Sequence, residues 1–298
     1  MWEELLAEIR KGHIKSLARS ISLVENEVAG YEWLMQQLPA VSDTRIIGIT
    51  GPPGAGKSTL VDALIGEMVA QHQKVAVLCV DPSSPFNLGA LLGDRIRMSE
   101  WYNHPSVFIR SLATRGSLGG LHPRIIEIAD LVKAAGFDQV IIETVGVGQS
   151  EIEIAGLADT TVVVMVPEAG DEVQTMKAGL MEIADIFVVN KADRPDADSF
   201  VKNLRLMLAP AFHRTTHEIA IVKTVASLKE GVKELFEKIR THQQLVRTND
   251  KKYWLLAEKA YHLIQQRRMK DVDKSALKKQ LEETKDTNLY QFIKRYLP

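Results

Sequence analysis

The middle of the chain alternates short apolar runs with segments of helical periodicity. Apolar runs suited to strands occupy residues 45–50, 74–80, 107–112, 139–142, 161–166, 186–189 and 218–225. The run at 74–80 is apolar throughout, as expected for a strand that is buried on both faces. Strands that alternate with helices, such as those expected at 123–135 and 229–239, predict an α/β fold. We expect a mainly parallel, doubly wound sheet.

The two ends of the chain lack this alternation, and their apolar residues are spaced as in helices. Residues 1–42 predict an N-terminal helical segment that packs as a cap on the next domain. Residues 43–240 form the expected α/β domain. Residues 241–298 predict a C-terminal helical segment, which we expect to mediate a homodimer.

Composition narrows the classes of partner and compartment. The net charge is −1, so the sequence predicts neither nucleic acid nor an anionic membrane as a partner. The single cysteine, Cys79, excludes a disulfide scaffold and a cysteine-rich metal site, and indicates a reducing compartment. No apolar run approaches the length of a membrane span, and the first residues lack a signal-peptide pattern. We therefore expect a cytoplasmic protein.

A glycine-rich turn after the first strand run fits G-x-x-x-x-G-K-[ST], the sequence of a phosphate-binding loop. Successive backbone N–H groups point inward in such a loop, and glycines let a phosphate approach closely. Lys57 supplies a positive charge for the β- and γ-phosphates, and Ser58 supplies a hydroxyl for Mg²⁺. The expected phosphate-loop residues are Gly51, Pro52, Pro53, Gly54, Ala55, Gly56, Lys57, Ser58 and Thr59.

A second motif, Asn190-Lys-Ala-Asp193, directly follows a predicted strand. N-K-x-D downstream of a phosphate loop is typical of guanine recognition. The Asp carboxylate accepts hydrogen bonds from the guanine N1–H and the exocyclic amine, and adenine does not present this pair of donors. The sequence therefore predicts GTP and GDP binding by Asn190, Lys191 and Asp193, with backbone groups at Ala226 near the purine edge.

Acidic residues that could surround a metal ion follow the strands. Glu143 stands where nucleotide hydrolases carry the Asp of Asp-x-x-Gly, so its carboxylate could hold a Mg²⁺-bound water. The N–H group of Gly146 could then meet the γ-phosphate. Asp81 follows an earlier strand, and Asp94 lies in the loop beyond it. The expected Mg²⁺ residues are Ser58, Asp81, Asp94 and Glu143.

Hydrolysis of GTP by the isolated chain is expected to be slow. In fast-cycling GTPases, a Gln directly after the Gly of Asp-x-x-Gly orients the attacking water. Val147 occupies that position here, and Gln149 could reach the site only after a rearrangement, which a partner could induce. The expected catalytic residues are Lys57, Asp94, Glu143 and Gln149.

Six blocks at loops and strand ends carry a family resemblance: Gly51-Pro-Pro-Gly-Ala-Gly-Lys-Ser-Thr59, Asp81-Pro-Ser-Ser84, Leu92-Gly-Asp-Arg-Ile-Arg-Met98, Glu143-Thr-Val-Gly-Val-Gly-Gln-Ser-Glu151, Gly170-Asp-Glu-Val-Gln174 and Glu182-Ile-Ala-Asp-Ile-Phe-Val-Val-Asn-Lys-Ala-Asp193. Together they resemble the MeaB/ArgK (MMAA-like) family of P-loop GTPases, over nearly the whole chain. The resemblance implies a chaperone that gates adenosylcobalamin loading, protection or reactivation of a methylmalonyl-CoA mutase-type enzyme.

The resemblance also assigns roles to loops. It implies that the loop before Asp94 acts as switch I, that residues 146–151 act as switch II, and that residues 168–174 contact the mutase. This chain departs from the family at two places. Pro167-Glu168-Ala169 stands where the family usually has Pro-Gly, and Leu88-Gly89 stands where it usually has Gly-Gly.

Three other functions remain open at this point. A nickel metallochaperone GTPase would need a His- or Cys-rich metal site, whereas the histidines here are scattered. A kinase, as in the older lysine/arginine/ornithine transport naming of the family, would need an acceptor site and a base, and neither is visible. A non-enzymatic scaffold would bind GTP without turning it over.

Overall fold

The computed structural model describes residues 1–40, 42–81, 98–114, 121–145, 150–169, 181, 183–212, 219–246, 251–284 and 288–296. The chain divides into two compact units, Met1–Lys252 and Tyr253–Pro298.

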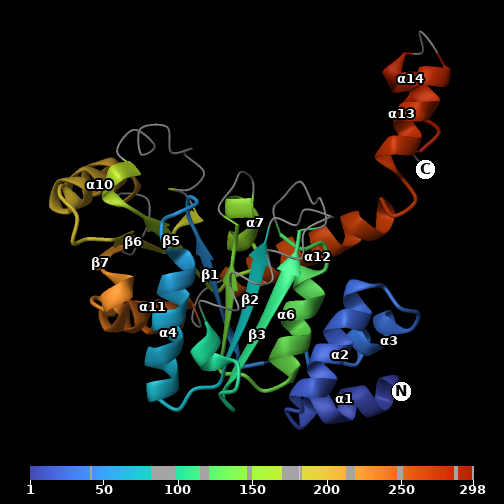
Figure 1. The fold of residues 1–298 in the computed structure, drawn as a ribbon. Helices are drawn as coiled ribbons and strands as arrows, with labels where there is room; N and C mark the ends of the chain where they lie inside the picture. Colours follow the sequence, from blue (N-terminus) through green and yellow to red (C-terminus); the bar gives the residue numbers. More distant parts are fainter. Residues whose placement is uncertain are drawn as a thin grey trace. The chain divides into compact units, whose positions relative to one another are not determined.

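Seven strands of the first unit form one parallel sheet in the order β3-β2-β4-β1-β5-β6-β7 (Figure 1). They are β1 (Arg45–Thr50), β2 (Val75–Asp81), β3 (Val107–Ala113), β4 (Gln139–Glu143), β5 (Thr160–Met165), β6 (Ile186–Asn190) and β7 (Ala220–Thr224). The expected α/β fold with a parallel sheet is confirmed. From β1 the chain builds β2 and β3 on one side, returns to place β4 between β2 and β1, and then adds β5, β6 and β7 on the other side. The carboxyl end of β1 therefore lies at the switch point where such sheets bind ligands.

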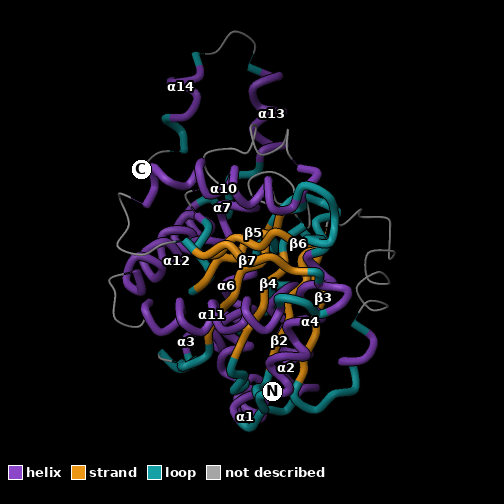
Figure 2. Tube along the Cα trace, turned by 90° about the vertical axis from the view of Figure 1, so that its left-hand side faces the viewer, coloured by secondary structure: helices purple, strands orange, loops and turns teal. Residues whose placement is uncertain are grey.

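Helices cover both faces of this sheet (Figure 2). Val162 and Val164 of β5 pack on one face with α4 (Lys57–Ala70) and α11 (Val232–Val246). Their neighbours in sequence point to the other face, where Val163 packs with α10 (Ala197–Phe212). Each fully buried aliphatic side chain contributes roughly 1.5–3 kcal/mol, so both layers hold the strand ends in fixed positions.

The N-terminal segment is helical and packs beside α6 (Figure 1). The helices are α1 (Trp2–Arg10), α2 (Ile14–Glu25), α3 (Tyr31–Gln36) and α6 (Ile125–Ala134). Arg110 of β3 donates from Nη2 to Glu25 Oε2 at 2.5 Å, and the Glu25 side chain is only 10% exposed. Arg124 pairs with Glu27 at 2.8 Å. Because the Arg110–Glu25 ion pair is partly buried and joins α2 to β3, it helps to anchor the N-terminal helices to the sheet.

The remaining α-helices of the described residues are α7 and three C-terminal helices. The first unit also contains α7 (Ser150–Ala155). The C-terminal helices are α12 (Lys251–Arg268), α13 (Lys274–Glu283) and α14 (Leu289–Ile293). Large apolar side chains of α12 are more than half exposed: Tyr253, Leu256, Tyr261 and Ile264. None of the helices in the described ranges is both long and apolar enough to cross a membrane.

Candidate nucleotide site

The phosphate loop joins β1 to α4 at the carboxyl edge of the sheet. Gly51, Gly54 and Gly56 have φ angles of 138°, 76° and 87°, in the region that favours glycine. A Cβ atom on Gly51 would lie 2.0 Å from the carbonyl oxygen of Val164. The loop can therefore lie directly against β5, and its N–H groups can gather around an anion at the start of α4.

Lys57 is the first residue of α4, and its side chain folds back over this loop. Its exposed fraction is only 7%, and Nζ donates hydrogen bonds to the carbonyl oxygens of Gly51 at 2.8 Å and Pro52 at 3.0 Å. The two carbonyl dipoles stabilise the buried ammonium group within the loop. The structure thus brings the expected phosphate-binding lysine into the loop itself.

Ser58 and Glu143 bring two oxygen groups together beside the phosphate loop. Ser58 Oγ donates to Glu143 Oε1 at 2.7 Å, although the two residues are 85 positions apart in sequence. Glu143 ends β4, which pairs with β1, and it is 6% exposed. Hydroxyl and carboxylate oxygens are the donors that Mg²⁺ prefers, so this pair fits the expected metal.

Asn190 connects three parts of the site from the end of β6. Its Nδ2 donates to the carbonyl oxygen of Ala55 at 2.9 Å, and its Oδ1 accepts from Thr224 Oγ1 at 3.0 Å and from the Ala226 N–H at 3.1 Å. A Cβ atom on Gly56 would lie 2.4 Å from Asn190 Nδ2. The buried amide therefore fixes the phosphate loop against the segment that follows β7.

Lys191 and Asp193 follow Asn190 at the carboxyl edge of the sheet. Lys191 has a φ of 56°, and its Nζ donates to the carbonyl oxygen of Gly54 at 2.8 Å. Asp193 is exposed, and none of the described residues donates a hydrogen bond to its carboxylate. The carboxylate therefore has acceptor positions open to a ligand.

The structure places the other expected residues as follows. Asp81 is the last residue of β2, the neighbour of β4, at the same edge of the sheet. Asp94, Gly146 and Gln149 lie outside the described residues, as do residues 170–174 of the expected mutase contact.

Several supporting contacts were missed by sequence reasoning. Thr144 Oγ1 donates to Thr50 Oγ1 at 2.9 Å beneath the site, and Thr224 supports Asn190. Arg194, directly after the Asn190–Asp193 motif, forms a close ion pair with Glu168. A hydroxyl or charged residue at a strand end does not by itself predict its contacts in the sequence, because only the strand order shows which strand ends are neighbours.

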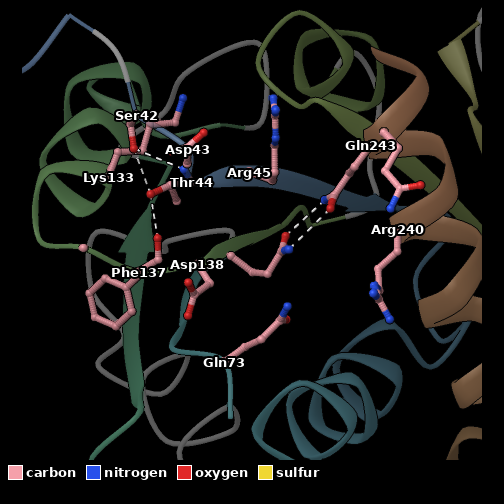
Figure 3. Close-up of a pocket in the computed structure, with 13 residues that line it drawn as sticks. Ser42, Asp43, Thr44, Arg45, Gln73, Lys133, Phe137, Asp138, Arg240 and Gln243 are labelled. Atoms are coloured by element: carbon pink, nitrogen blue, oxygen red, sulfur yellow. Dashed lines mark hydrogen bonds between the residues drawn. The ribbon is translucent and has the colours of Figure 1, made fainter. Parts of the chain in front are cut away.

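A separate cavity of about 470 Å³ lies where β1 and β4 begin (Figure 3). Arg45 and Gln139 start these strands, and Gln139 exchanges two amide hydrogen bonds with Gln243 of α11, at 3.3 and 3.0 Å. Arg240 and Gln243 approach it from α11. Because this cavity is at the amino ends of the strands, it is not the phosphate site.

Comparison with known proteins identifies the family. The family model described as methylmalonyl Co-A mutase-associated GTPase MeaB matches residues 17–281. The chain belongs to the MeaB family of GTPases. The expected family is confirmed, and so is the assignment as an enzyme that hydrolyses GTP.

Three similar proteins support this membership. A putative GTPase of Pyrococcus horikoshii is 48% identical over 261 residues, which cover 86% of this chain and 81% of that protein. A protein named fused isobutyryl-CoA mutase from Geobacillus kaustophilus is 37% identical over 236 residues, which are 74% of this chain but 22% of that protein. The crystal structure of a LAO/AO transport system kinase superposes with a TM-score of 0.66 at 27% identity, covering 99% of this chain and 96% of that one.

The position of Lys57 generates a prediction. Lys57→Ala should weaken GDP and GTP binding at least about tenfold, because a hydrogen bond to a charged group is worth roughly 1.5–3 kcal/mol. Isothermal titration calorimetry measures the affinity, and Lys202→Ala, an exposed lysine on α10, is the matched control. Unchanged affinity in Lys57→Ala would remove Lys57 from the phosphate site.

Proposed function

We propose that this GTPase gates adenosylcobalamin loading, protection or reactivation in a methylmalonyl-CoA mutase-type enzyme. The observation that carries the proposal is the match of residues 17–281 to a family described as mutase-associated. The fused relative adds support, because a segment similar to this chain lies within a protein named for a mutase. We also propose that the protein is cytoplasmic.

The chemistry starts from the phosphate loop. Backbone N–H groups and Lys57 would hold the β- and γ-phosphates and stabilise the negative charge that develops during transfer to water. Ser58 and Glu143 would hold Mg²⁺, whose contribution is to neutralise phosphate charge; Asp81 and Asp94 would complete its water shell. Gly146 and Gln149 would complete the hydrolytic site when a partner reshapes their segment.

Base selection is the second part of the proposal. Asn190 fixes the position of the loop, and the Asp193 carboxylate would accept from the N1–H and amine of guanine. Lys191 would cover the base while its ammonium stays on the Gly54 carbonyl. The segment at Ala226, held by Asn190, would border the purine edge.

Asp193→Asn should therefore change the base preference from guanine to xanthine. The loss for GTP should be about five- to 150-fold, since an unpaired buried donor or acceptor costs roughly 1–3 kcal/mol. Competition binding with GTP, XTP and ATP measures the preference. Equal affinity of the wild type for GTP and ATP would contradict guanine recognition.

Gating by the mutase should appear in the rate of hydrolysis. We expect slow single-turnover hydrolysis by the isolated chain and acceleration by the cognate mutase, and each tenfold needs about 1.4 kcal/mol of transition-state stabilisation. Glu143→Gln should retain GTP binding and lose Mg²⁺-dependent turnover. Gln149→Ala should retain the slow rate and lose the stimulation.

Rapid hydrolysis without a mutase would contradict gating. Stimulation that survives in Gln149→Ala would leave the gating in place and assign the water-positioning role to another residue.

We also propose that the C-terminal helices mediate a homodimer. The apolar side chains of Tyr253, Leu256, Tyr261 and Ile264 lie within one broad stripe of α12 by their spacing, and all four are more than half exposed. Such a stripe favours a partner helix.

Leu256→Glu combined with Ile264→Glu should convert a dimer into a monomer that still binds GDP, because two charges would be buried in the contact. Sedimentation of the full chain at micromolar concentration measures the mass. Lys259→Glu, a charge reversal on the same helix, is the control. A wild-type monomer would contradict the proposal.

A further inference from the structure

Arg194 and Glu168 link the base-reading loop to the turn that follows β5. Arg194 comes directly after Asp193, and Glu168 lies in the short turn Pro167–Ala169. Arg194 Nη1 donates to Glu168 Oε1 in a close ion pair whose side chains are 45% and 49% exposed. This hydrogen bond, with added attraction from Lys191, holds the pKa of the Glu168 carboxyl below its ordinary value.

Arg194 has the chemistry to compete with guanine for Asp193, to which it is adjacent in sequence. A guanidinium group presents two parallel N–H donors to a carboxylate. Guanine would present the same pattern to Asp193 through its N1–H and exocyclic amine. Asp193 has no donor among the described residues, while the adjacent Arg194 is held by Glu168.

We propose that Glu168 is a positioning residue that holds Arg194 away from Asp193 and so keeps that carboxylate available to guanine. This inference rests on the proposed base-reading role of Asp193. It makes the release rate of guanine nucleotide depend on the turn after β5. A partner with a basic group that engages Glu168 would free Arg194 and accelerate nucleotide release.

A simpler role for the ion pair makes a different prediction. If the pair only fastens two loops together, removing either partner should accelerate release to the same extent. If Glu168 restrains a competitor, removing Glu168 is harmful only while Arg194 is present. The double variant, which lacks both Glu168 and Arg194, therefore distinguishes the two roles by its rate of nucleotide release.

The experiment measures dissociation of a fluorescent N-methylanthraniloyl GDP, chased with excess GDP, from the full chain with Mg²⁺. Glu168→Gln should accelerate release about two- to fivefold, the range of an exposed ion pair. Arg194→Gln should release at the wild-type rate or more slowly. The double variant should match Arg194→Gln and not Glu168→Gln.

Asp198→Asn provides the matched control. Asp198 pairs with Lys223 at 2.7 Å, also on the surface and also close in sequence to the motif, so the pair is comparable but involves neither Glu168 nor Arg194. Its release rate should equal that of the wild type. Acceleration in Asp198→Asn equal to that in Glu168→Gln would overturn the proposal, because any lost surface pair would then suffice.

Inosine diphosphate separates failure of this inference from failure of base reading, because inosine lacks the exocyclic amine. The wild type should prefer GDP to IDP, and Glu168→Gln should reduce that preference while Arg194→Gln retains it. A double variant that releases GDP as fast as Glu168→Gln would overturn the role of Glu168. A wild type without any preference for GDP would overturn base reading by Asp193 and the inference with it.

Discussion

The buried amide of Asn190 joins the ends of three segments, namely the phosphate loop, the end of β6 and the residues that follow β7. It donates to the phosphate loop at Ala55 and accepts from Thr224 and from the Ala226 N–H. Gly56 packs so closely on it that a Cβ atom there would collide with Nδ2. Breaking this amide would leave buried polar groups unpaired, at about 1–3 kcal/mol each. The Asn190 amide therefore fixes the phosphate loop against the end of β7, and the Lys191–Gly54 hydrogen bond adds a second link to the same loop.

Backbone packing at the phosphate loop imposes a second requirement on the sheet. Gly51 lies against the Val164 carbonyl at a distance that admits no side chain. The spacing of β1 and β5 is set by their ladder, so only glycine can occupy this position. The same edge carries Glu143 at the end of β4, because β1 pairs with β4 on its other side. Strand order thus brings Ser58 and Glu143 within hydrogen-bonding distance.

Sequence patterns predicted the strands, their parallel arrangement and the motifs at their ends, because apolar runs and phosphate-loop glycines are local signals. The sequence placed Ser58 and Glu143 around one Mg²⁺, but it did not predict the order of the strands, and the direct hydrogen bond between the two side chains depends on the pairing of β4 with β1. Helix α11 begins at Val232 and not at the expected Lys229. Lys229 adopts a left-handed φ of 60°, and Val225 and Glu230 close a tight turn before the helix. The Glu168–Arg194 pair is likewise a contact between loops, and the spacing of apolar residues in the sequence does not predict such contacts.

The order of the strands along the chain also determines when each part of the site emerges from the ribosome. Strands β1 to β4 form one side of the sheet, so the phosphate loop and Glu143 are complete within the first 143 residues. Strands β5, β6 and β7 then add in sequence to the open edge of β1, and they bring Asn190 and Ala226. Because a domain folds as a unit, the phosphate loop would reach its final geometry only after β5 and β6 have emerged, since these strands supply the Val164 backbone beside Gly51 and the Asn190 amide. A ribosome-bound chain that ends after β4 would thus contain the phosphate-loop sequence without the packing that gives the loop its shape.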